Sequence, residues 1–108
     1  MKAYGRKSHA PPGTRRYLIH LSCAQEENTG HCRYVLRIQL WKPRSNSRRS
    51  RAEERFFEDE LALAEAVNPL LPGGADVRNV LSYVESAEGF LYLLHLNPEQ
   101  AKTLGWRA

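Results

Sequence analysis

The sequence predicts a single α+β domain, and three observations support this prediction. Residues 15–24 and 32–42 are rich in β-branched and aromatic side chains, which is typical of strands. Residues after 50 change to the apolar spacing of three and four that helices show. A chain of 108 residues is also a usual size for one domain with its own core. We therefore expect the order ββααβα, with an antiparallel three-stranded sheet and helices packed mainly on one face.

The first two strands are expected to pair as a hairpin, because the segment QEENTG between them ends in a turn-forming Asn-Thr-Gly. Every second residue of a strand faces the same side of its sheet, which separates a core face from an outer face. A turn centred on Glu27 and Asn28 sets Cys23 opposite Cys32, and a register shifted by two stays open. We expect both thiols to be buried and reduced. The residues assigned to the core face are Tyr17, Ile19, Leu21, Cys23, Cys32, Tyr34, Leu36, Ile38 and Leu40.

The outer face of the same hairpin is predicted to be basic and partly apolar. Such a mixture fits a protein interface as well as a nucleic-acid surface. The residues assigned to the outer face are Arg16, Leu18, His20, Ser22, Arg33, Val35, Arg37, Gln39 and Trp41.

Two helices are predicted between the hairpin and the next strand. Ser50 and Glu53 have the spacing of a capping box, so the first helix is expected to begin there, and Pro69 ends it. Asp76 can cap the second helix, which stops at Gly89. The apolar stripe of the first helix is Phe56, Phe57, Leu61, Ala64 and Val67, and that of the second is Val77, Val80, Leu81 and Val84.

The last predicted elements are a strand over residues 90–96 and a short helix that Asn97 opens in a capping box. The strand sequence FLYLLHL is apolar on both faces, and such strands are normally covered on both. The second face must then be covered either by the final helix, with Leu104 and Trp106, or by a second copy of the protein. The residues on this second face are Leu91, Leu93 and His95.

Charge divides the chain into two halves. The net charge is +4, but residues 1–51 hold twelve basic against two acidic residues and residues 52–108 hold four against ten, which gives +10 and −6. We expect a flexible basic N-terminal arm over 1–14 and a single α+β domain over 15–108 with an Arg-rich loop at 42–51. The first half is therefore expected to attract anionic partners.

The Arg-rich loop lies directly before the first predicted helix. Positive charge is slightly unfavourable at a helix N-terminus, so helix stability does not explain the cluster. We interpret it as a surface that follows phosphates, with Trp41 as a stacking platform. The alternative is a solvated loop in which Arg51 and Arg55 pair with nearby carboxylates. The candidate binding residues are Arg33, Arg37, Trp41, Lys42, Arg44, Arg48, Arg49 and Arg51.

No catalytic residue, metal ligand or cofactor is predicted. His20 and Cys23 lie three residues apart, so their side chains leave opposite faces of the strand and favour neither a zinc site nor a Cys-His pair. A Gly-rich phosphate loop is also missing from the sequence. His20 and His95 could meet if the first and third strands pair, and whether they form a site stays open.

We therefore expect a non-enzymatic binding module whose partner is nucleic acid, a nucleoprotein complex or an acidic protein surface. The alternative is a small protein-binding regulator or inhibitor, of the kind that mobile elements encode, which occupies a partner's surface. A homodimer through the strand at 90–96 is compatible with both. No apolar run reaches the length of a membrane span, and no apolar segment of a secretion signal follows the basic start. We expect no membrane contact and a cytoplasmic location.

Overall fold

A computed structural model describes residues 11–25, 30, 32–41, 51–86 and 88–107. Within these residues the fold is α+β, with a four-stranded antiparallel sheet in the order β3-β2-β1-β4. The predicted class is right, whereas the three-stranded sheet and the order ββααβα are wrong, because the segment after the hairpin adds a strand. The elements are β1 (Arg15–Gln25), β2 (Cys32–Leu40), β3 (Ala52–Phe57), α2 (Glu60–Val67), the 3₁₀-helices η1 (Asn68–Leu70), η2 (Pro72–Gly74) and η3 (Val77–Val80), α3 (Leu81–Val84), β4 (Phe90–Leu96) and α4 (Pro98–Thr103).

The hairpin of β1 and β2 has the predicted faces, and its register is the one shifted by two. Tyr17 pairs with Leu40, and Cys23 pairs with Tyr34 rather than with Cys32. A shift of two leaves every side chain on its face, because the faces alternate with a period of two. The buried residues of this core face are Tyr17, Ile19, Leu21, Tyr34, Leu36 and Ile38.

Cys23 is disulfide-bonded, so the prediction that both thiols stay reduced is wrong. The chain contains one other cysteine, Cys32, whose backbone pairs with Gln25 and not with Cys23. The prediction of free thiols followed from an assumed reducing compartment rather than from the distance between two neighbouring strands.

Strand β3 occupies the position where the first predicted helix was expected to begin. Its pairing with β2 places Glu53 in a strand and not in the first turn of a helix. Phe57 is buried and Phe56 is exposed, as the alternation of a strand requires. Helix α2 begins later, where the carboxylate of Asp59 accepts a hydrogen bond of 2.9 Å from a backbone N–H of the first turn. The predicted cap, Ser50, lies outside the described residues.

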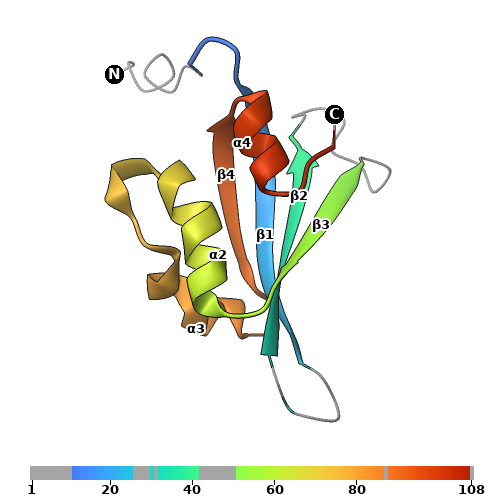
Figure 1. The fold of residues 1–108 in the computed structure, drawn as a ribbon, viewed down its shortest axis with the longest axis vertical. Coiled ribbons are helices and arrows are strands. Elements are labelled where there is room, and N and C mark those ends of the chain that lie inside the picture. The colour runs from blue at the N-terminus through green and yellow to red at the C-terminus, as the bar shows by residue number, and fades with distance from the viewer. Residues whose placement is uncertain (1–10, 26–29, 31, 42–50, 87, 108) are drawn as a thin grey trace.

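Helices α2, α3 and α4 lie against the same face of the sheet (Figure 1). These helices are short, and in the described part of the chain none has the length and apolar composition needed to cross a membrane. Leu104, which follows α4, is fully buried with the inward side chains of the strands. The final helix therefore does not cover Leu91 and Leu93, which are 57% and 48% exposed on the other face. Of the two covers expected for these leucines, the final helix is therefore wrong, because α4 packs on the core side.

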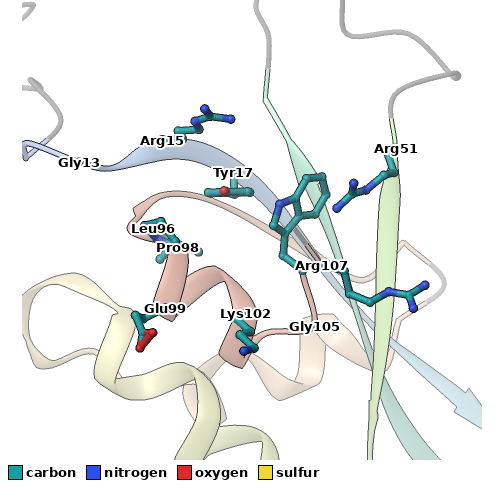
Figure 2. Close-up of a pocket in the computed structure, with 11 residues that line it drawn as sticks. Gly13, Arg15, Tyr17, Arg51, Leu96, Pro98, Glu99, Lys102, Gly105 and Arg107 are labelled. Atoms are coloured by element: carbon teal, nitrogen blue, oxygen red, sulfur yellow. The ribbon is translucent and has the colours of Figure 1, made fainter.

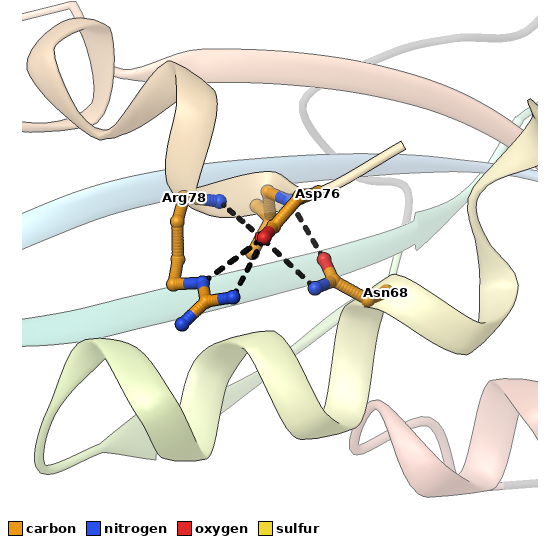
Figure 3. Close-up of polar contacts among 4 residues, drawn as sticks. Asn68, Asp76 and Arg78 are labelled. Atoms are coloured by element: carbon orange, nitrogen blue, oxygen red, sulfur yellow. Dashed lines mark hydrogen bonds and ion pairs between the residues drawn. The ribbon is translucent and has the colours of Figure 1, made fainter. Parts of the chain in front are cut away.

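A polar cluster joins the end of α2 to η3 (Figure 3). The Asp76 carboxylate accepts hydrogen bonds from Asn68 Nδ2 at 2.9 Å, from Arg78 Nη2 at 2.8 Å and from the Arg78 backbone N–H at 3.0 Å. Asn68 Oδ1 in turn accepts a hydrogen bond of 2.6 Å from the backbone N–H of Val77. The side-chain hydrogen bond from Arg78 is the main reason that the pKa of the Asp76 carboxyl lies well below its usual range. The predicted role of Asp76 as a helix cap is confirmed.

Candidate anion-binding site

A pocket of about 830 Å³ opens beside α4, at the end of the sheet where β1 begins and β4 ends (Figure 2). Its lining comes from three distant parts of the sequence, which the fold brings to one place. The charged residues of the lining are Arg15, Arg51, Glu99, Lys102 and Arg107, and the apolar and aromatic ones are Tyr17, Leu96, Pro98 and Trp106.

Trp106 connects the aromatic and cationic parts of the pocket. Its ring meets that of Tyr17 edge to face, with the centroids 5.6 Å apart. The guanidinium carbon of Arg51 lies 4.1 Å from the centroid of the indole ring, which is the geometry of a cation–π contact. Glu53 lies beside two of the cations, with its carboxylate 3.2 Å from Arg51 Nε and 3.6 Å from Arg107 Nε. The pocket therefore has oriented guanidinium groups next to an aromatic wall.

Hydrogen bonds hold helix α4 at both ends. They therefore also hold the part of the pocket lining that this segment supplies. Asn97 Oδ1 accepts a hydrogen bond of 2.8 Å from the Gln100 backbone N–H, and Gln100 Oε1 accepts one of 2.9 Å from the Asn97 backbone N–H. This capping box confirms the predicted start of the helix. Gly105 ends the helix with φ +103°, a conformation that favours glycine. The turn there lets the Trp106 backbone N–H donate to Ala101 O at 3.0 Å, so the indole returns to the sheet.

The eight residues predicted to bind an anionic partner do not form one surface. Arg51 lines the pocket, on the side of the sheet that the helices cover. Arg33 and Arg37 alternate with the buried residues of β2, so they lie on the side of the sheet that the helices leave uncovered. We call this side the open face. The Trp41 backbone N–H donates to Arg16 O at 2.9 Å. This hydrogen bond continues the pairing of β1 with β2, so Trp41 lies opposite Arg16. The remaining four, Lys42, Arg44, Arg48 and Arg49, lie outside the described residues.

Each of the two strand arginines on the open face has an acidic residue as a neighbour, one by an ion pair and the other by strand pairing. Arg33 Nε is 3.7 Å from Glu58 Oε1. Arg37 is paired across the ladder with Glu54. These neighbours reduce the net positive charge of the open face, which is less basic than the sequence predicts.

The open face also carries exposed apolar side chains. Leu91 and Leu93 on β4 lie opposite His20 and Leu18 on β1. At the other edge of the sheet, Phe56 is 54% exposed. The open face therefore carries apolar as well as charged side chains, a mixture that resembles interface composition.

His20 and His95 do not form a site. Strands β1 and β4 do pair, but His20 lies opposite Leu91 and His95 opposite Arg16, four positions away along β1. Four positions of a strand span about 13 Å. His20 Nε2 lies 3.0 Å from Glu88 O, and Arg16 Nε donates to His95 Nε2 at 3.4 Å. Across the described ranges, no three His, Cys, Asp or Glu side chains gather in a way that could hold a metal ion.

Most of the pocket was not predictable as a site from the sequence. Arg15, Lys102 and Arg107 are not among the predicted binding residues, and Trp106 was expected only to cover the strand at 90–96. The available signal was weak: an aromatic and a basic residue follow the helix stop at Gly105. Nothing local in the sequence shows that this segment meets the start of β1.

The assignment of a function depends on this geometry together with the charge of the chain. Comparisons with family models, curated proteins and solved structures find no match to this chain.

Proposed function

We propose that this chain is a non-enzymatic binding module for an anionic macromolecule, namely nucleic acid or a nucleoprotein complex. One observation supports the proposal most strongly: four cationic side chains line the same pocket as the Tyr17–Trp106 pair, at one end of the sheet. Cations that neutralise phosphates, combined with aromatic rings, are the usual means of binding a nucleic-acid strand without reading its sequence. The four cations are Arg15, Arg51, Lys102 and Arg107.

The proposed interface includes the Arg-rich segment on the basis of its sequence. Residues 42–50 connect Trp41 to Arg51, and Arg51 is itself part of the pocket. Lys42, Arg44, Arg48 and Arg49 would then add to the same cationic end. Arg33 and Arg37 contribute less to the proposal, because they lie on the open face of the sheet and do not line the pocket.

The salt dependence of binding tests this proposal. We expect the association constant for a fluorescent single-stranded oligonucleotide to fall linearly with salt on a logarithmic scale, between about 50 and 200 mM. Replacing Arg44, Arg48 and Arg49 with serine should reduce the slope by about 2, since each phosphate contact on a single strand contributes about 0.7. The same change should alter the free energy of unfolding by less than about 0.5 kcal/mol, because exposed substitutions usually do. Fluorescence anisotropy and urea denaturation measure the two quantities.

An uncharged peptide nucleic acid with the same bases is the matched control, and it should not bind. Equal binding of the charged and uncharged strands would contradict a phosphate-directed interface. An unchanged salt slope in the triple variant would remove the Arg-rich segment from the interface.

The open face favours a second candidate function, a protein-binding regulator or inhibitor. Strand β4 is an edge strand, and its outward side chains Leu91 and Leu93 are exposed. Natural edge strands are usually protected by charge or proline, whereas FLYLLHL has only His95. A second copy of the chain paired along β4 in an isologous dimer is the simplest partner for this edge.

Sedimentation velocity at micromolar concentration tests the dimer. We expect a species of twice 12.4 kDa, which Leu93→Glu converts to a folded monomer. Leu61→Glu is the matched control, because Leu61 is similarly exposed, at 56%, but lies on α2. A wild-type monomer would reject the dimer, and dissociation by Leu61→Glu would place the contact on the helices instead.

A further inference from the structure

The pocket beside α4 has the size and lining of a small-molecule site, in addition to its charge. Its volume of about 830 Å³ lies within the range of roughly 300–1,000 Å³ that such pockets occupy. Leu96, Pro98 and the aromatic pair form an apolar part of the lining. A flat nucleobase can pack against these side chains, whereas inorganic phosphate alone would leave them in contact with water. The lining therefore fits a ligand that has both an aromatic and an anionic part.

The four cations of the pocket have two different environments. Arg51 and Arg107 are oriented by Glu53, at 3.2 and 3.6 Å. No ion pair within the described part of the chain includes Arg15 or Lys102. A phosphate monoester carries between about 1.5 and 2 negative charges at neutral pH and three acceptor oxygens. Oriented guanidinium groups together with uncompensated cations match this charge better than they match a single carboxylate.

Glu99 makes the two sides of the pocket different in charge. Figure 2 shows Glu99 and Arg51 on opposite sides of the pocket, with Glu99 on α4. A carboxylate repels phosphate, so a bound phosphate would lie toward Arg15 and Arg51 and away from Glu99.

We propose that this pocket binds a phosphorylated nucleoside unit, with the phosphate near Arg15 and Arg51 and the base against Trp106. The inference rests on the proposed function, because it names the group recognised at the cationic end of the sheet. The unit is either a free mononucleotide or the phosphorylated end of a strand, and both present the same chemistry.

Trp106 fluorescence provides a direct readout. The chain has two tryptophans, so Trp41→Phe leaves Trp106 as the single emitter. Adenosine monophosphate should quench it in a saturable way, at least about tenfold more tightly than adenosine or inorganic phosphate, because each of these lacks one half of the contacts. Equal affinities for inorganic phosphate and adenosine monophosphate would overturn the inference.

Two neighbouring arginines supply a matched pair of variants. Arg15 lines the pocket, whereas Arg16 lies on the other face of β1 and donates to His95. Arg15→Gln should weaken adenosine monophosphate binding about tenfold, and Arg16→Gln, with the same change of charge, by less than about twofold. Similar losses in both variants would show that net charge alone attracts the ligand, which would overturn the pocket site.

Short oligonucleotides distinguish the two sources of the ligand. Tighter binding of a pentanucleotide with a 5′-phosphate than of either its 5′-hydroxyl form or adenosine monophosphate supports a strand end, and equal binding of mononucleotide and phosphorylated strand supports a free nucleotide. Salt-dependent binding of long strands without saturable quenching by adenosine monophosphate would overturn the inference and leave the proposed function standing. Saturable quenching without strand binding would support the pocket and reject the proposed function.

Discussion

Replacing Gly89 with alanine is expected to destabilise the fold by about 3 kcal/mol or more. Gly89 directly precedes β4 and has φ +72°, where a side chain is strained. A Cβ at this position would stand 2.3 Å from the Leu21 carbonyl oxygen and 2.8 Å from His20 Nε2. The imidazole can rotate away, but the Leu21 carbonyl belongs to the backbone of a central strand and cannot move without disturbing the ladder. Urea denaturation of the two proteins measures the loss.

Gly74→Ala separates the two causes of this effect. Gly74 has a similar φ of +69°, but a Cβ there would meet nothing within 4 Å. Its replacement should therefore cost only the backbone strain, about 1 kcal/mol. Equal losses at both positions would show that the close approach to β1 does not contribute.

Replacing Leu104 with alanine is the second change with a large expected effect, about 2–5 kcal/mol. Leu104 has no exposed surface and belongs to the core beneath the helices. Its truncation leaves a cavity where α4 meets the sheet, and Trp106 follows two residues later. We expect a lower urea midpoint with little change in the slope of the unfolding curve, since the surface exposed on unfolding changes little.

Leu91→Ala is the matched control, because the same side chain is removed from a surface position. Leu91 is 57% exposed on the open face, so its loss should change the free energy of unfolding of the monomer by less than about 0.5 kcal/mol. If Leu91→Ala were the more destabilising of the two changes, α4 would have to pack on the opposite face of the sheet.

The faces of β1, β2 and β4 could be predicted because burial imposes a period of two on each strand. The register of the hairpin could not, because Cys23 pairs with either Cys32 or Tyr34 without any side chain changing face. The register also decides which residue lies opposite each cysteine, so the pairing of Cys23 and Cys32 could not be predicted either.

Strand β3 shows where local signals were insufficient. The spacing from Ser50 to Glu53 suits a helix start, and nothing within the segment excludes it. Its conformation instead depends on pairing with β2, in which Phe56 lies opposite Val35. Contacts between distant residues commonly override local preference in this way.

Of the predicted binding residues that lie in the described ranges, Arg51 is the one that lines the pocket. Its basic character was visible in the sequence, but its contact with Trp106 was not. That contact requires the segment after α4 to return to the sheet, which follows from the turn at Gly105 and from the burial of Leu104. Residue types could therefore indicate an anionic partner, while the location of the site depended on how distant segments pack.

The position of the pocket determines where a reporter can be attached. Gly13 and Arg107, near the two ends of the described chain, both line the pocket, so a dye or surface linker attached at either residue would lie at the rim of the site. Strand β1 begins at Arg15, which also lines the pocket, and ends at Gln25, ten residues later and about 33 Å away. A linker attached near Gln25, at the hairpin turn, would hold the molecule on a sensor surface with the pocket facing the solution. Binding measured with a group attached at Gly13 or Arg107 would instead include competition from that group.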